Sequence, residues 1–292
     1  MAPRIKLLIF LLPALLAGGG IAAAQSPGQD VVAVLSSESG PYREASAGLQ
    51  EGLGATPQTF VLSREEPDIP PATRVVVAFG SKAALRGYPD GVTLIYALAP
   101  AADVPDPAVE VCMTLEASQL LANMRKVHPG LKRIGILWRS RQLAPYIEKL
   151  RQAGRNEGIT IERAALGSNS DIPDQLRRLY GKIDAIWLPP DPLLLNADSL
   201  AIFTGFSRAN AVPLFVPTGG LLEQGATAAV GASFREMGRL AGLAAQQALS
   251  GSVPESKIYP VKVEISVNKA VAAQIGLKIP EETLRNADRR LP

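Results

Sequence analysis

The chain contains a single histidine, His128, and a single cysteine, Cys112. A Cys/His zinc site needs several such ligands and a disulfide needs two cysteines, so this inventory excludes both within the chain. His128 precedes Pro129 and Gly130, a sequence typical of a helix end, where histidine is a solvated or capping residue. Cys112 lies in an apolar run, which favours a small buried side chain over a reactive thiol.

Sequence motifs of catalysis are missing as well. The chain has no G-x-S-x-G nucleophile elbow, no G-x-x-x-x-G-K-[ST] phosphate loop and no G-x-G-x-x-G after a strand. These motifs do not reveal catalytic carboxylate pairs, because folding can bring such pairs together from distant positions. We therefore expect a protein that is not an enzyme and that has no cofactor and no metal.

Small, polar and aromatic residues do recur directly after, or close to, apolar segments that could be strands. In a parallel sheet these positions meet at the carboxyl edge, where ligands bind and helix N-termini attract anions. The candidate ligand-binding residues are Ser36, Ser37, Tyr42, Gly80, Ser81, Tyr96, Trp138, Ser140, Asp191, Thr218 and Gly219. Each residue type is also common in ordinary turns, caps and cores, so the group is more informative than any member.

Two successive series of strands and helices would position these residues. The first series has strands at 31–35, 74–79 and 93–96 and helices at 45–53 and from 82. A helix at 117–127 leads to a second series with strands at 134–138, 159–161, 185–188, 214–216 and 228–232. Short, continuous apolar runs of this kind are typical of parallel strands covered on both faces. The pattern predicts two doubly wound α/β lobes that separate near residues 113–132.

The composition is that of a globular protein, with 292 residues, 47% hydrophobic and 20% charged. The formal net charge is +3, but Arg4 and Lys6 lie before residue 25, and the remainder has 28 basic and 27 acidic residues. Nucleic-acid binding needs a clustered basic face, so we expect no nucleic-acid partner.

The N-terminus has the order of a secretory signal. Arg4 and Lys6 precede the apolar residues 7–16, three glycines follow, and Ala22, Ala23 and Ala24 supply small residues for cleavage. We expect a signal peptide at 1–24 that is removed to leave a periplasmic protein. The competing interpretation is an uncleaved membrane anchor, which the short apolar run and the glycines disfavour.

Several segments together are typical of one family. They are HPGLKRIGIL at 128–137, IDAIWLPPD at 183–191, VNKAVA at 267–272 and IGLKIP at 275–280. With the order of the elements, they resemble ABC-transporter substrate-binding proteins of the tryptophan- and tyrosine-binding type, which have the type I periplasmic-binding fold. The passage between Leu53 and Arg74 is shorter than is usual in the family. A shorter passage could remove one wall of the ligand pocket.

The resemblance implies two lobes, an inter-lobe cleft and more than one crossing between the lobes. We expect the first lobe at 30–118 plus about 233–256, and the second at 119–232 plus about 257–292.

The expected function is capture of a small ligand, such as an aromatic or other amino acid, and its delivery to an ABC permease by a monomeric binding protein. Ser36, Ser81 and Thr218 would bind its carboxylate and Asp191 its ammonium group, while Tyr42, Tyr96 or Trp138 would cover its side chain. The alternative is a periplasmic sensory or accessory binding module that keeps the fold without serving a transporter.

Overall fold

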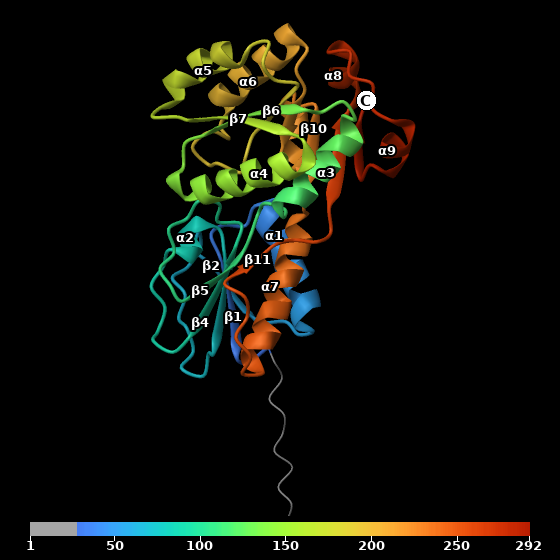
Figure 1. The fold of residues 1–292 in the computed structure, drawn as a ribbon. Coiled ribbons are helices and arrows are strands. Elements are labelled where there is room, and N and C mark those ends of the chain that lie inside the picture. Colours follow the sequence, from blue (N-terminus) through green and yellow to red (C-terminus); the bar gives the residue numbers. More distant parts are fainter. Residues whose placement is uncertain (1–27) are drawn as a thin grey trace, which may run out of the picture.

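The computed structural model describes residues 28–292, and it forms two α/β lobes, one above the other in Figure 1. The predicted signal peptide at 1–24 lies outside the described residues. Over the described range the first lobe has a six-stranded sheet in the order β11-β5-β4-β3-β1-β2, and all neighbouring strands are parallel. Its strands are β1 (Val31–Leu35), β2 (Gln58–Val61), β3 (Val75–Phe79), β4 (Thr93–Ala97), β5 (Ala108–Val111) and β11 (Lys257–Ile258).

The second lobe has, within residues 28–292, a seven-stranded sheet in the order β13-β12-β10-β9-β8-β6-β7. The pair β10–β12 is antiparallel and the other neighbouring pairs are parallel. Its strands are β6 (Arg133–Trp138), β7 (Thr160–Ala165), β8 (Ala185–Trp187), β9 (Leu214–Val216), β10 (Ala228–Gly231), β12 (Glu264–Asn268) and β13 (Arg289–Leu291). The two doubly wound lobes predicted from the sequence are confirmed, with this one antiparallel pair as a departure.

The helices divide between the two sheets. Those of the first lobe are α1 (Gly40–Leu53), α2 (Ser81–Ala84) and α7 (Phe234–Leu249). Those of the second are α3 (Ala117–Val127), α4 (Ala144–Glu157), α5 (Ile172–Leu179), α6 (Ala197–Asn210), α8 (Lys269–Gln274) and α9 (Glu281–Asn286), with 3-10 turns η1 (Arg141–Leu143), η2 (Asn169–Asp171) and η3 (Gly219–Gln224). No helix in the described part of the chain is both long and apolar enough to span a bilayer.

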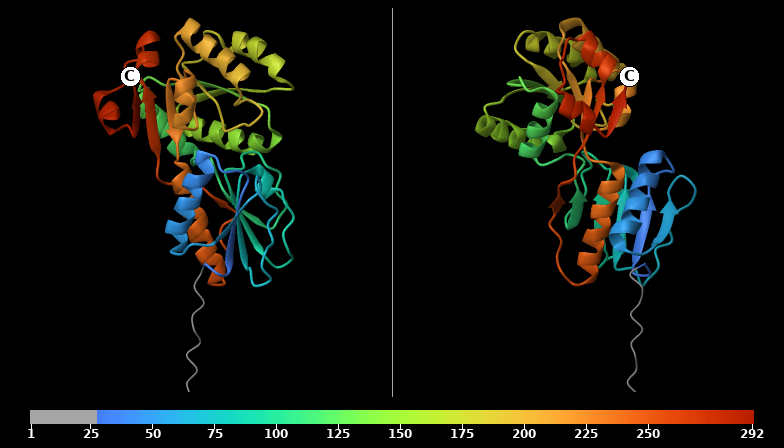
Figure 2. Two further views of the ribbon diagram at one scale, coloured as in Figure 1. Left: turned by 180° about the vertical axis from the view of Figure 1, so that it is seen from behind. Right: turned by 90° about the vertical axis from the view of Figure 1, so that its right-hand side faces the viewer.

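The sequences of the central strands explain their burial. Every residue of β1 (VVAVL) and of β3 (VVVAF) is buried, as expected for β-branched runs in a parallel sheet covered on both faces. Helices α1 and α7 lie side by side along one face, as both views in Figure 2 show. The opposite face is covered by the short helix α2 and by loops, among which Phe60 and Tyr96 are buried.

This thin covering follows from the short passage after Leu53. Four residues, 54–57, separate α1 from strand β2. A loop at 62–74, rather than a helix, then leads from β2 to β3. Strands β2 and β5 were not predicted, because four-residue strands with polar residues give little periodic signal.

The chain crosses between the two sheets three times over residues 28–292. The crossings follow β5, β10 and β11, so α7 and β11 return to the first lobe while β12 and β13 complete the second. Pairing with β5 places Lys257 and Ile258 in the first sheet, just past the boundary near 257 that the sequence suggested.

Candidate functional site

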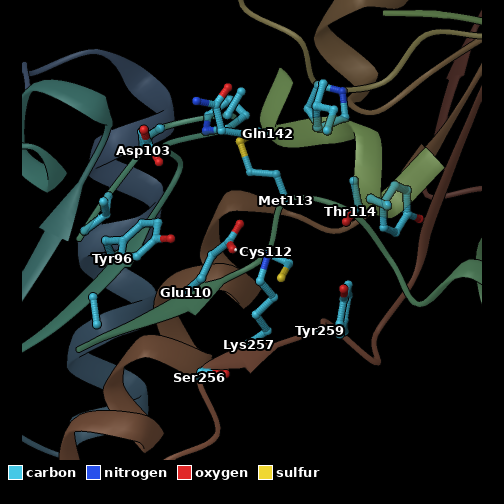
Figure 3. A pocket seen from close by; sticks show the side chains of 18 of the residues that line it. Tyr96, Asp103, Glu110, Cys112, Met113, Thr114, Gln142, Ser256, Lys257 and Tyr259 are labelled. Carbon is cyan, nitrogen blue, oxygen red and sulfur yellow. Dashed lines mark ion pairs between the residues drawn. The ribbon is translucent and has the colours of Figure 1, made fainter. Parts of the chain in front are cut away.

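A cavity of about 390 Å³ lies between the lobes, at the carboxyl ends of β4, β5 and β11 (Figure 3). The first lobe contributes the loop after β4, while the second contributes η1, the start of α4 and Pro190. Its principal polar and aromatic lining residues are Tyr96, Asp103, Asp106, Glu110, Cys112, Thr114, Gln142, Tyr146, Ser256, Lys257 and Tyr259. Both lobes and two crossing segments therefore meet around one cavity.

The first-lobe side of this cavity carries an ion pair. The Nζ atom of Lys257 lies 3.0 Å from Oε2 of Glu110 on the neighbouring strand. Burial alone would lower the pKa of Lys257, but the hydrogen bond and charge of Glu110 outweigh it and raise that pKa. Burial, and then the charges of Glu110 and Cys112, raise the pKa of the Tyr96 hydroxyl. Tyr96 is therefore a neutral hydroxyl at physiological pH, and Lys257 a cation already paired.

The crossing segments form one side of the cavity, with Cys112, Thr114 and Tyr259. Burial, and then the charge of Glu110, raise the pKa of Cys112 to about 12, so this residue is a protonated thiol. Tyr259 stacks on Tyr146 with ring centroids 6.4 Å apart, and Nζ of Lys149 lies 4.6 Å from the centroid of its ring. Cys112 is thus a packing residue of the cavity, as the sequence indicated.

A second cavity, of about 490 Å³, adjoins the first and shares Ala101 and Gln142 with it. The other lining residues come from the loops after β6, β7 and β8 of the second lobe. They are Arg139, Ser140, Arg141, Leu166, Gly167, Pro192 and Leu193. The cleft is therefore acidic on the first-lobe side, at Asp103 and Asp106, and basic on the second-lobe side, at Arg139 and Arg141.

The loop after β4 has an unusual backbone. Leu98 and Ala101 have φ angles of 55° and 58°, a left-handed conformation that costs a non-glycine residue roughly 1–2 kcal/mol. Ala101 borders both cavities, and Asp103 follows two residues later. Strained backbone of this kind persists where the surrounding structure imposes it, and it clusters at ligand-binding sites.

Of the candidate residues, Tyr96 lines the cavity between the lobes and Ser140 lines the adjoining one. Ser36, Tyr42 and Gly80 form a separate group in the first lobe. Ser36 Oγ accepts a hydrogen bond from the N–H of Ala83 at 3.1 Å, and a Cβ atom at Gly80 would lie 2.5 Å from it and 2.6 Å from Oη of Tyr42. Gly80, with φ of 92°, is thus a glycine for steric reasons.

The other candidates lie elsewhere. Ser37 and Ser81 are half-buried beside this group, and Trp138 is buried at the end of β6. Thr218 and Gly219 line a different cavity of about 390 Å³, together with Glu44, Glu264 and Arg289. The structure therefore does not bring Thr218 together with Tyr96.

The sequence suggested that Asp191 binds an ammonium group, but the structure gives its carboxylate another role. Its side chain is fully buried, and its two oxygens accept four hydrogen bonds. The donors are the N–H groups of Arg139, Ser140 and Leu193 and the hydroxyl of Ser140, at 2.6–3.0 Å. A carboxylate occupied in this way holds protein loops, and it has no oxygen to offer to an ammonium group.

Lining residues outside the candidate set include Asp103, Gln142, Lys257 and Tyr259 in the first cavity and Arg141 in the second, while Arg139 stood out in the sequence only as a neighbour of Ser140 at a strand end. They lie in loops, in the short turn η1, in the two-residue strand β11 or in the crossing after it, and no periodic pattern marks such short segments. The only available signal was proximity to a strand end, as for Arg139 directly after β6.

Two α/β lobes of this topology, with a lined cleft between them, are typical of two-lobed ligand-binding proteins. A family model described as ABC transporter substrate binding protein matches residues 113–291. The chain belongs to this family of substrate-binding proteins, and its fold is that of the type I periplasmic-binding proteins.

Individual relatives are distant. A tyrosine-binding protein of Clostridioides difficile is 23% identical over 159 residues, which are 53% of this chain and 46% of the relative. An uncharacterized protein of Rickettsia prowazekii is 26% identical over 128 residues, which are 44% of this chain and 42% of the relative. The match thus spans less than half the length of each of these curated relatives.

Solved structures share the fold over nearly the whole chain. An ABC domain from Streptococcus pneumoniae in complex with L-Trp superposes with a TM-score of 0.62 at 18% identity, covering 90% of this chain and 100% of that one. The ligand-free, open structure of a substrate-binding protein with adhesive properties from Clostridium difficile gives 0.66 at 15% identity, with the same coverage. These likenesses establish the two-lobed architecture.

Proposed function

We propose that this protein captures a small amino acid-like ligand between its lobes and delivers it to an ABC permease. The observation that carries the proposal is the pair of adjoining cavities, with carboxylates on one lobe and guanidinium groups on the other. A zwitterion presents one group of each sign, and closure of the lobes would bring both charges of the cleft onto it.

In this proposal, each part of such a ligand has a partner in the lining. Asp103, an exposed residue that lines the cavity, is the partner for an ammonium group, in place of the saturated Asp191. Arg139 and Arg141 are the partners for a carboxylate. Tyr96, Met113 and Tyr146 provide an apolar and aromatic surface for a side chain.

The size and the relatives favour an aromatic amino acid. A cavity of about 390 Å³ lies at the lower end of the range usual for small-molecule sites, about 300–1,000 Å³. One relative is named for tyrosine binding, and one structure with this fold holds L-Trp. We therefore propose tyrosine, tryptophan or a closely similar molecule as the ligand.

Export and partnership complete the proposal. We infer that residues 1–24 direct the chain to the periplasm, where it acts as a monomeric carrier for a membrane permease. Membership of the substrate-binding family supports this placement, since such proteins work outside the cytoplasmic membrane.

The test is calorimetric titration of the protein comprising residues 25–292 with each of the twenty amino acids. Binding of an aromatic amino acid is expected, and D103N should weaken it about tenfold, because it removes a charge-assisted hydrogen bond. D68N is the matched control, since Asp68 is an exposed aspartate in a first-lobe loop outside both cavities. No binding of any amino acid at millimolar concentration would refute this ligand class.

A second function has one observation in its favour. Loops and the four-residue α2, rather than full helices, cover one face of the first sheet, so a permease that docked on this face would meet a reduced surface. A sensory or accessory module that keeps the cleft would tolerate this reduction. A neighbouring gene for a sensor kinase would favour this function, and neighbouring genes for a permease and an ATPase would favour transport.

A further inference from the structure

The three loops that carry the second-lobe half of the cleft are joined by a network of side-chain hydrogen bonds. Asp191, in the loop after β8, accepts from the N–H groups of Arg139 and Ser140 in the loop after β6, at 2.6 and 2.9 Å. It also accepts from the hydroxyl of Ser140 at 2.6 Å and from the N–H of Leu193 at 3.0 Å. The main chain at Arg139 is therefore fixed relative to the next strand of the sheet.

Asn169 extends this network to the loop after β7. Its amide Nδ2 donates to the carbonyl oxygen of Leu193 at 3.0 Å and to Oγ of Ser199 at 3.2 Å. Its Oδ1 then accepts a hydrogen bond from Nη1 of Arg139 at 3.3 Å. The two donated bonds fix the orientation of the amide, so its oxygen faces the guanidinium group.

Local structure holds Asn169 in this place. It is the first residue of the 3-10 turn η2, and Ser168 and Asp171 form a capping box around that turn. Oδ2 of Asp171 accepts from the N–H of Ser168 at 2.9 Å and from that of Gly167 at 3.0 Å. The side chain of Asn169 therefore projects from a rigid turn.

The charge of Arg139 is left for another partner. None of the ion pairs found among residues 28–292 involves Arg139, whereas many other arginines of that range pair with a carboxylate. A neutral amide orients the guanidinium group without neutralising it. A half-buried arginine held in this way in a cleft is arranged for an anionic ligand.

We propose that Asn169 and Asp191 are positioning residues that hold Arg139 for the carboxylate of the ligand, and that the selectivity of the cleft for a carboxylate depends on them. This inference rests on the proposed function. Asp191 fixes the main chain of Arg139, and Asn169 fixes the direction of its side chain. The expected signature is a change in selectivity between matched ligands, beyond any change in stability.

The test compares L-tyrosine with L-tyrosinamide, and L-tryptophan with L-tryptophanamide, by calorimetry at about pH 6, where the amine of each amide is still largely protonated. Each amide keeps the amine and the ring but lacks the negative charge. The unsubstituted protein should prefer the amino acid, and N169A should reduce that preference at least about fivefold. Because Asp191 is fully buried and its replacement endangers the fold, Asn169 carries the test.

N196A is the matched control. Asn196 bonds to the same two residues, since its Nδ2 donates to the Leu193 carbonyl at 3.2 Å and its Oδ1 accepts from the Ser199 N–H at 3.0 Å. It caps helix α6, so its loss should lower the melting temperature without changing the preference. R139Q should reduce the preference at least as much as N169A does, with Arg141 still present, and N169A added to R139Q should change it no further.

The outcomes separate the two proposals. Binding with an unchanged preference in N169A, or an equal effect of N169A in the R139Q background, would refute the positioning role and leave the binding function standing. Failure of both amino acids and both amides to bind the unsubstituted protein would remove the proposed ligand class, and this inference with it.

Discussion

Helices α1 and α7 pack so closely that replacing a glycine between them should destabilise the first lobe. Gly238 of α7 packs on the main chain of α1, and a Cβ atom there would clash with the carbonyl oxygen of Ala45 and lie 2.6 Å from its carbonyl carbon. Gly48 and Gly52 of α1 meet the carbonyl groups of Arg235 and Arg239 in the same way. Backbone atoms cannot rotate away as a side chain can, so G238A must separate the two helices.

The size of the effect follows from two opposing terms. Replacing glycine by alanine in a helix interior gains about 1 kcal/mol from helix propensity. Overpacking of a tightly packed interface costs typically about 1–3 kcal/mol, and backbone clashes belong at the upper end or beyond. We therefore expect G238A to lower the stability by about 2 kcal/mol or more. For a chain of this size, that corresponds to a fall of roughly 4–8 °C in the melting temperature.

The matched control is G205A. Gly205 is exposed in the interior of α6, and a Cβ atom there would meet nothing within 4 Å. The propensity term then acts alone, and G205A should raise the stability by about 1 kcal/mol. Thermal unfolding followed by circular dichroism measures both variants. If the G238A protein were as stable as the G205A protein, close contact between the helices would not be the reason that Gly238, Gly48 and Gly52 are glycines.

Two further predictions concern single titratable groups. Cys112 is buried with a pKa of about 12, so iodoacetamide should modify the native protein far more slowly than the urea-unfolded chain, and fast stoichiometric labelling of the native protein would contradict this assignment. Burial, opposed by the hydrogen bond to Ser233 and assisted by the charge of Asp288, raises the pKa of Glu264 above 4.5. The folded state thus retains this proton longer than the unfolded state, and stability falls as pH rises from about 4.5 through the folded pKa. E264Q should therefore stabilise the protein at pH 7 relative to its effect at pH 4 in urea titrations, and an equal effect at both would be inconsistent with the raised pKa.

How far the sequence predicts the fold depends on the length and polarity of each segment. The strands VVAVL and VVVAF are continuous β-branched runs, and their position and burial could be predicted directly. The edge strand β2 (QTFV) and strand β5 (AVEV) have only four residues each, and polar residues (Gln58 and Thr59 in β2, Glu110 in β5) interrupt their apolar pattern. Their pairing depends on the central strands β1 and β4, so no local signal announces it.

The site shows the same limit at the level of single residues. The sequence identified Tyr96 as a candidate, and the structure places it in the cavity between the lobes. It also singled out Asp191, but the four donors that occupy this carboxylate come from loops that only folding brings to it. Asp171 behaves similarly: it precedes α5 as a capping residue would, but its carboxylate accepts from the N–H groups of Gly167 and Ser168 instead of from α5. Residue type predicts a capacity for hydrogen bonding, and tertiary structure determines which partner receives it.

In the proposed function, the crossing segments would connect ligand binding to movement of the lobes. The hydroxyl of Tyr146 in α4 donates to the carbonyl oxygen of Leu115 at 2.7 Å, and Lys149 lies 2.9 Å from Glu116 while it covers the ring of Tyr259. Two crossings are thus attached to a helix of the second lobe and would move with it.

Bending on closure would then fall between these attachments and the first sheet, at Cys112–Thr114 and next to Tyr259. These same residues line the cavity between the lobes. A ligand seated there would contact the bending segments themselves, and its affinity would differ between open and closed lobes by the contacts that bending adds.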